Sequence, residues 1–255
     1  MRIKQVDGLK VITGPDWPGV SYFCTTRVGG VSEAPWRSLN VGLHTGDNRQ
    51  HVLENRQRVA PPSGTVVWLE QVHGTDVLDA DTDAALAGTP VRADAAVTTR
   101  PDRVLAIMVA DCLPVVLGSA DGRIIGAAHA GWRGLAAGVL ENTLQALQSR
   151  FIQRNAPSWR AWIGPGISQP NFEVGDDVYK RFVQNDAAMG RFFLPGKPGK
   201  WLADLAGVAR YRLMQAGVQR VDVSPLCTFE RSDLLYSYRR DGVTGRQVVL
   251  VQRKM

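Results

Sequence analysis

The sequence is poor in cysteine and histidine, the residue types that most often form cross-links or bind metal ions. It has three cysteines and four histidines in 255 residues. Cys24, Cys112 and Cys227 are too few and too far apart for a disulfide framework, and their odd number leaves at least one thiol free. We therefore expect each cysteine to serve as a core residue, a metal ligand or a nucleophile.

The sequence also lacks a long apolar run. No stretch reaches the roughly 18 consecutive apolar residues of a membrane span, and the first residues contain no apolar core of the kind found in signal peptides. We expect a cytoplasmic protein without a membrane partner.

Positive charge is in excess, yet it is not concentrated anywhere. The formal net charge of +6 favours an anionic partner, although simple solubility is an alternative explanation. Arginine is spread along the chain, and no basic tail, zinc finger or RNA-binding module is recognisable. We expect a small anionic substrate, no nucleic-acid partner, and a monomer or a weak homodimer.

The hydrophobic pattern predicts many strands and few helices. Strands are predicted over 20–26, 65–72, 93–99, 104–111, 114–118, 123–129, 159–163, 221–227 and 245–253. Helices are predicted after Asp47 as N-cap up to Ala60, over 135–151, over 201–216, and for a shorter stretch after Glu173. Because the two types do not alternate regularly, we expect an α+β fold: a single domain over 1–255 with mixed β-sheets and outer helices.

Three short polar motifs each follow an apolar run. They are Gln71-Val-His73-Gly74, Ala110-Asp111-Cys112 and His129-Ala-Gly-Trp-Arg133-Gly134. A residue at the end of a buried strand is held rigidly, so these motifs can place their side chains in one pocket. Two imidazoles and one thiolate form a three-ligand zinc set with an open fourth position, which is the arrangement of catalytic zinc sites. We therefore predict zinc ligands at His73, Cys112 and His129.

Each of these residues also has a purely structural explanation. An isolated cysteine is more often a buried core residue, and a histidine at a strand end is more often a hydrogen-bonded structural residue. Asp111 is harder to bury without a partner, so it favours a polar site next to Cys112. The case for a metal site rests on the three positions occurring together.

Other residues are candidates for binding an anion or a sugar. Arg133 stands beside glycines before a predicted helix, where free amides and the helix dipole favour anions. Arg27, Asn40 and His44 lie in polar, glycine-rich loops. Turn formation explains Asn40 and His44 equally well, and Arg27 less well.

The motifs together resemble the laccase-domain family, also called the YfiH-like or multicopper polyphenol oxidase family. The resemblance extends over nearly the whole chain, through the segments 25–32, 68–73, 93–95, 110–114, 129–134 and 237–247. It implies a YfiH-like fold and a zinc-dependent purine nucleoside phosphorylase acting on adenosine, inosine and methylthioadenosine, with adenosine deaminase activity. It also implies zinc at His73, Cys112 and His129. The chain departs from the family at Phe172, where a tyrosine is usual, and in the loop 163–168, which lacks a frequent cysteine.

We derive provisional roles for the candidate residues. In deamination, zinc activates water for attack on the purine C6, and Asp111 is the candidate for proton transfer. In phosphorolysis, Arg27 is the first candidate for phosphate and Arg133 the second. Asn40 and His44 are candidates for holding ribose or phosphate.

Three alternatives remain open from the sequence. The first is a copper-dependent, laccase-like polyphenol oxidase: a single copper can occupy the His73, Cys112 and His129 set, but four histidines are too few for a multicopper cluster. The second is a cytoplasmic peptidoglycan-editing hydrolase in which His129 activates Cys112. The third is a metal-dependent binding factor without turnover.

Overall fold

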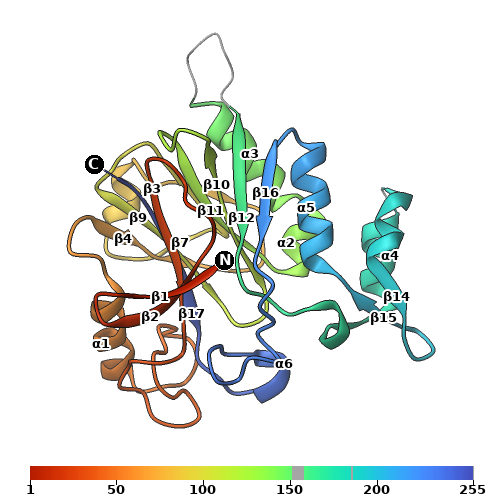
Figure 1. Cartoon of the computed structure of the whole chain (residues 1–255), viewed down its shortest axis with the longest axis horizontal. Helices are drawn as coiled ribbons and strands as arrows, with labels where there is room; N and C mark the ends of the chain where they lie inside the picture. Colours follow the sequence, from red (N-terminus) through yellow and green to blue (C-terminus); the bar gives the residue numbers. More distant parts are fainter. Residues whose placement is uncertain (151–157, 185, 255) are drawn as a thin grey trace.

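Two six-stranded β-sheets face each other in the computed structural model, which describes residues 1–150, 158–184 and 186–254 (Figure 1). The first sheet has the spatial order β1 (Arg2–Val6), β2 (Leu9–Thr13), β3 (Val20–Thr25), β17 (Gln247–Arg253), β9 (Arg103–Val109) and β4 (Thr65–Val67). The second has the order β16 (Arg220–Val223), β12 (Trp159–Ile163), β10 (Leu113–Ser119), β11 (Ile125–Ala130), β8 (Ala95–Thr98) and β6 (Val77–Asp79). Both sheets are mixed, since the pairs β4–β9, β12–β16 and β6–β8 are parallel.

Alternation of side chains along the strands builds three apolar layers. Successive residues of a strand point to opposite faces of its sheet. In β9, therefore, Leu105, Ile107 and Val109 join the core between the sheets, while Val104, Ala106 and Met108 join the core on the outer face. In β10, Val116 faces the first sheet and Val115 faces the outer helices. Both strands are buried on both faces, which explains their unbroken apolar sequences.

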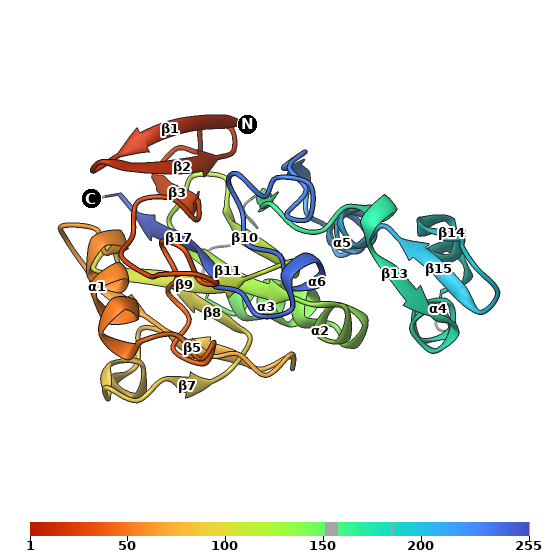
Figure 2. The ribbon, with the colours of Figure 1, turned by 90° about the horizontal axis from the view of Figure 1, so that it is seen from below.

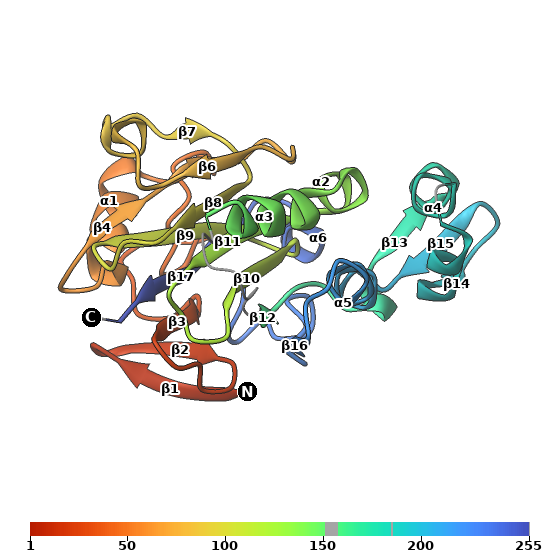
Figure 3. The same cartoon turned by 90° about the horizontal axis from the view of Figure 1, so that it is seen from above.

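Helices cover the outer face of each sheet. The helices α2 (Trp132–Ala137), α3 (Val139–Gln148) and α5 (Leu205–Gln215) pack on the second sheet, and α2 and α3 lie beside β11 (Figure 3). The helix α1 (Arg49–Val59) covers the first sheet together with Leu39 and Val41. Smaller elements are the β5 (Leu69–Glu70) and β7 (Val91–Arg92) pair, the 3₁₀ turns η1 (Asp83–Leu86) and η2 (Gln169–Asn171), and α6 (Tyr238–Asp241).

A small lobe lies at one end of the molecule, beyond α5 (Figures 1 and 2). It contains the three-stranded sheet of β13 (Glu173–Gly175), β15 (Lys200–Ala203) and β14 (Phe193–Pro195), with the helix α4 (Asp176–Val183) and the 3₁₀ turn η3 (Ala187–Phe192). Its interior is aromatic: the Tyr179 ring stacks on the Trp201 ring with their centroids 4.0 Å apart. We call residues 173–184 and 186–203 the α4 lobe.

The α+β architecture with mixed sheets and outer helices is confirmed, but two helices begin or end elsewhere than predicted. The helix predicted over 135–151 consists of α2 and α3, because Gly138 adopts φ 105° and interrupts it. Phe151, at its predicted end, lies outside the described residues. The helix predicted from Trp201 begins only at Leu205 after the N-cap Asp204, and Trp201 belongs to β15.

Other boundaries also differ from the prediction. The N-cap of α1 is Asn48, whose side chain accepts a hydrogen bond from the Gln50 amide, and not Asp47. The strand predicted over 65–72 is divided at Trp68 into β4 and β5, and that predicted over 221–227 ends at Val223. The hairpin of β1 and β2 was not predicted, because β1 is exposed and polar. Among the described helices, none has the length and apolar character needed to cross a membrane.

Candidate metal centre

The structure brings His73, Cys112 and His129 together. Their ligand atoms all lie within 4.8 Å of one another, and the Cys112 Sγ is 3.8 Å from the His73 Nε2. The two imidazole rings meet edge to face with their centroids 4.7 Å apart. All three side chains line one cavity of about 390 Å³, here called the main cavity.

Cys112 lies where the chain crosses from one large sheet to the other. β9 of the first sheet ends at Val109, and β10 of the second begins at Leu113. The gap predicted between the strands 104–111 and 114–118 is present, although β10 begins one residue earlier than predicted and includes Pro114. Asp111 turns the chain with φ 96°, a backbone conformation that is uncommon outside glycine.

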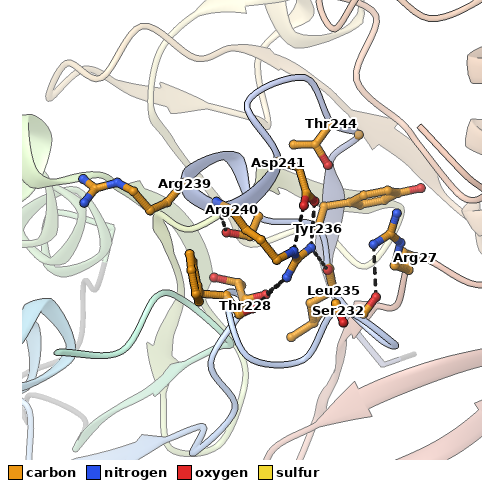
Figure 4. A network of polar contacts seen from close by, with 12 residues as sticks. Arg27, Thr228, Ser232, Leu235, Tyr236, Arg239, Arg240, Asp241 and Thr244 are labelled. Atoms are coloured by element: carbon orange, nitrogen blue, oxygen red, sulfur yellow. Dashed lines mark hydrogen bonds and ion pairs between the residues drawn. The ribbon is translucent and has the colours of Figure 1, made fainter. Parts of the chain in front are cut away.

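Asp111 is held by hydrogen bonds to both of its carboxylate oxygens. The Thr228 hydroxyl donates to Oδ1 at 2.5 Å, and the Arg239 amide donates to Oδ2 at 2.6 Å. Figure 4 shows the segment that carries these donors, in which the Arg240 guanidinium donates to the carbonyl oxygens of Thr228 and Leu235. Asp111 is buried and is absent from the residues lining the main cavity. Its contacts hold the turn before Cys112.

Asp94 organises both histidines, and it was not among the candidates from the sequence. The carboxylate is fully buried and lies 2.8 Å from the His129 Nδ1. It also accepts hydrogen bonds from the amides of Val72, His73 and Gly74. These three amides enclose the carboxylate while His73 adopts φ 62°. The sequence could have indicated Asp94, because a carboxylate within an apolar run, here just before β8, must have partners if it is buried.

The site is electrostatically polarised. Burial opposes ionisation of Cys112, but His129 and then His73 outweigh it and lower the thiol pKa to about 6. Burial likewise opposes protonation of His129, but Cys112 and Asp94 raise its pKa to about 9. The pKa of Asp94 is lowered despite its burial, because His129 and the Gly74 amide bond to the carboxylate. These opposite shifts favour a thiolate at Cys112 beside an imidazolium at His129.

The donor set fits a metal ion such as zinc. Asp94 occupies the His129 Nδ1, which leaves Nε2 as the atom for a metal, as is usual for metal-binding histidines. Tetrahedral angles and ordinary zinc bond lengths separate a thiolate sulfur from an imidazole nitrogen by roughly 3.5 Å. The distance of 3.8 Å between the Cys112 Sγ and the His73 Nε2 is close to that value. A small adjustment of the side chains is therefore enough for binding.

Gly131 keeps the space beside these ligands open. A Cβ at this position would lie 2.8 Å from the His73 Cδ2 and 3.0 Å from the Cys112 Sγ. We expect Gly131→Ala to weaken zinc binding about tenfold, because crowding of this kind costs roughly 1–3 kcal/mol. Zinc competition against a chromophoric chelator measures the effect. Gly190→Ala is the control, since its Cβ would make only ordinary contacts; equal affinities for both variants would contradict the assignment.

The walls of the main cavity are partly polar. Besides the three ligand residues, they consist of His44, Gln71, Met108, Val109, Ala110, Tyr238 and Arg246. Gln71 is not free, because its amide exchanges two hydrogen bonds of 2.8 Å with the backbone of Met108. The His44 pKa is lowered by burial and by Arg246. Arg246 was missed in the sequence, although it lies within one of the segments that carry the family resemblance.

Asn40 supports the backbone of two segments that line the main cavity, those of His44 and Arg246. Its side chain is fully buried, and its Oδ1 accepts hydrogen bonds from the amides of Gly42 and Arg246. Its Nδ2 donates to Thr45 and Asp47. Asn40 is therefore placed to position Arg246 and the loop that carries His44, while its own side chain does not line the cavity.

The structure does not bring Arg27 or Arg133 into the main cavity. Arg27 donates to the carbonyl oxygens of Arg37 and Ser232, the second of which is visible in Figure 4, and its guanidinium lies over the Tyr236 ring. Arg133 lines a different cavity, which shares His73 with the main one. His44 is thus the one residue among these sugar and anion candidates that faces the main cavity.

Comparison with known proteins finds relatives that match nearly the whole chain. A family model described as multi-copper polyphenol oxidoreductase laccase matches residues 21–254. The chain is 43% identical over 246 residues to the purine nucleoside phosphorylase YfiH of Escherichia coli K12, covering 93% of this chain and 96% of that one. A solved Neisseria meningitidis structure aligns with a TM-score of 0.87 at 40% identity, covering 96% and 98% of the two chains. YlmD from Geobacillus stearothermophilus aligns with a TM-score of 0.86 at 32% identity, covering 99% of each chain.

Proposed function

The chain belongs to the multi-copper polyphenol oxidoreductase laccase family, and we propose that it is a zinc-dependent purine nucleoside phosphorylase. The observation that carries the proposal is the set of two imidazoles and one thiolate beside a cavity of about 390 Å³ that also contains Arg246. That volume lies in the usual range for small-molecule sites. The name of the Escherichia coli relative supports the same reaction.

The metal would be held by His73, Cys112 and His129. When bound there, zinc supplies Lewis-acid chemistry and a means of activating water. Asp94 fixes the ring orientation of His129 and the backbone that carries His73. Asp111 positions Cys112 through the turn between the two sheets, which is the role that its two hydrogen bonds support.

Phosphorolysis requires a residue that holds phosphate. In this reaction a phosphate oxygen forms a bond to C1′ while the C1′–N9 bond breaks, and the purine leaves with the electron pair and gains a proton. Arg246 donates from Nη1 to the carbonyl oxygens of Thr244 and Gly245, and its Nε and Nη2 have no hydrogen-bond partner among the described residues. These free donors suit phosphate, which guanidinium groups bind in a bidentate manner.

His44 and the apolar wall suit the nucleoside. Partial burial and the Arg246 charge lower the His44 pKa, which favours the neutral imidazole. A neutral imidazole donates one hydrogen bond and accepts another, as two ribose hydroxyls require. Met108, Val109 and Ala110 form an apolar wall for the purine. We include adenosine, inosine and methylthioadenosine as substrates, and deamination of adenosine as a second activity, on the strength of the family resemblance.

One observation favours a second candidate, a cysteine hydrolase. Cys112, His129 and Asp94 form a nucleophile, a base and an orienting carboxylate, and the thiol pKa of about 6 makes Cys112 reactive at neutral pH. In that mechanism the metal is dispensable. Hydrolytic activity that persists after chelation, in protein whose loss of metal has been verified, would favour the hydrolase.

The phosphorylase is tested by its dependence on phosphate. Protein of measured zinc content is incubated with inosine or adenosine, with and without phosphate, and the products are separated by chromatography. We expect hypoxanthine and a sugar phosphate from inosine only when phosphate is present. Arg246→Met should raise the KM for phosphate at least about tenfold, while the exposed Arg49→Met serves as the control. Purine release that ignores phosphate would contradict the proposal.

A further inference from the structure

A second cavity adjoins the metal centre on the side of the α4 lobe. It has a volume of about 350 Å³ and shares His73 with the main cavity. Its other walls are Trp132, Arg133 and Ala137 from α2, and Asp177 and Arg181 from α4. We call it the α2–α4 cavity. A ligand at the metal centre can therefore extend toward residues of the lobe.

The two arginines of the α2–α4 cavity are unpaired. Within the described part of the chain, neither guanidinium makes an ion pair, and neither donates a hydrogen bond that meets ordinary geometric limits. Arg133 lies over the Trp132 ring at 4.5 Å, which occupies the face of the guanidinium and leaves its N–H edge free. Asp177 is the one carboxylate among the residues that line this cavity. The charged groups facing it therefore carry a net positive charge.

A third cavity next to the α2–α4 cavity allows Arg181 to be compared with an arginine that has a partner. Arg181 also lines this third cavity, of about 340 Å³, together with Arg212 and Glu141. There Arg212 is neutralised by Glu141 and also donates to the Leu135 carbonyl oxygen. Among the described residues Arg181 makes no ion pair, and Asp186, the other carboxylate lining this cavity, accepts hydrogen bonds from the Tyr211 hydroxyl and the Ala188 amide. Two exposed guanidinium groups from different elements thus border one cavity without an ion-pair partner among the described residues.

A phosphoryl group has the chemistry that these donors require. Its oxygens accept several charge-assisted hydrogen bonds at once, and guanidinium groups match their geometry. An anion between Arg133 and Arg181 also removes the repulsion between the two cations. Because the cations come from α2 and α4, such a ligand bridges the main body and the lobe.

We propose that the α2–α4 cavity is an anion subsite for a phosphoryl group, so that the protein accepts nucleoside 5′-monophosphates beside nucleosides. The proposal rests on the proposed function, because it assumes that the nucleoside is bound next to His73. The phosphoryl group has two sources, the ester of a nucleotide and inorganic phosphate, and both present the same oxygens to Arg133 and Arg181.

Binding titrations test the subsite without requiring turnover. Zinc-loaded wild-type protein and the double variant Arg133→Gln/Arg181→Gln are titrated with adenosine, adenosine 5′-monophosphate and inorganic phosphate by calorimetry. Since the double variant removes the charged donors from both sides of the cavity, it should bind the monophosphate at least about tenfold more weakly. Adenosine affinity should change less than about twofold. Lys180→Gln, an exposed change on the same helix, is the control.

The pattern of losses identifies the source of the anion. A loss confined to adenosine 5′-monophosphate assigns the subsite to a nucleotide ester, while a loss confined to inorganic phosphate assigns it to the free ion and rejects the nucleotide substrate. Equal affinities of the wild type and the double variant for both anions would overturn the subsite, as would equal losses in the Lys180→Gln control. Failure of phosphorolysis with a selective loss of anion binding would instead reject the proposed function and leave the subsite standing.

Discussion

Replacing Cys112 with alanine is expected to abolish stoichiometric zinc binding and to reduce phosphorolysis of inosine by at least about a thousandfold. Cys112 is one of three ligand atoms gathered within 4.8 Å, and two imidazoles alone do not make a tight zinc site. A Lewis acid contributes several kcal/mol of transition-state stabilisation, and about 4 kcal/mol corresponds to a thousandfold change in rate. Metal analysis of the purified variant and initial rates at saturating phosphate measure the two effects.

Two further variants serve as controls for the effect of Cys112→Ala on zinc binding and activity. Cys24→Ala removes a buried thiol from β3, outside the metal centre, and should retain both zinc and activity. His73→Ala removes a proposed metal ligand and keeps the Cys112, His129 and Asp94 triad; because His73 also lowers the thiol pKa, the variant is assayed up to a pH at which Cys112 ionises without it. Loss of zinc and activity in His73→Ala supports the metal mechanism. A Cys112→Ala protein that lacks metal but keeps full activity would contradict it.

Replacing Asp94 with alanine is expected to have the largest effect on stability. The change leaves the partly buried amides of Val72, His73 and Gly74 without their acceptor and removes the partner of the buried His129. Each unsatisfied buried group costs about 1–3 kcal/mol, so the free energy of unfolding should fall by roughly 4 kcal/mol. Zinc affinity should fall a further 10–100-fold, as is typical when the partner of a metal-binding histidine is lost. Urea unfolding of the metal-free protein and zinc competition measure the two effects.

The loss of stability in Asp94→Ala should depend on pH in a defined direction. The pKa of the Asp94 carboxyl is lowered in the folded protein, so the carboxylate contributes its full stability above the unfolded value of about 4. That contribution is lost as the pH falls through the folded pKa, and the difference between wild type and variant should shrink in acid. Asp233→Ala, which breaks an exposed pair with Arg231, should cost at most about 1 kcal/mol. Similar losses in both variants would contradict the role of Asp94.

The grouping of His73, Cys112 and His129 was accessible to sequence reasoning because their positions follow from simple physical rules. Each follows or closes an apolar run: Cys112 precedes β10, His129 lies near the end of β11, and His73 follows the short strand β5. Asp94 was not accessible in the same way. Its partners are three backbone amides 20 to 22 positions earlier in the chain and one imidazole 35 positions later. A backbone amide is present in nearly every residue, so the sequence does not show which amides will bind a carboxylate. Arg246 was missed for a similar reason, since its placement depends on the buried Asn40.

The errors in the fold prediction also have local causes. The apolar positions of α2 and α3 follow one continuous helical pattern in the sequence. The two helices are separate because Gly138 adopts a positive φ. Trp201 and Leu202 fit a helical pattern, but pairing of β15 with both β13 and β14 holds them as a strand. The strands of the α4 lobe are three to four residues long, too short for alternation to be visible.

Because the chain crosses between the two sheets at Cys112, a metal ion bound there would affect how stable the protein is in the cell. Because Cys112 lies between β9 of one sheet and β10 of the other, while His129 belongs to β11, an ion bound by both joins segments that separate on unfolding. Such an ion stabilises the native state by mass action, in proportion to the logarithm of its free concentration. Zinc-starved cells should therefore degrade this protein faster than zinc-replete ones, and its abundance should follow the metal supply before any change in its synthesis.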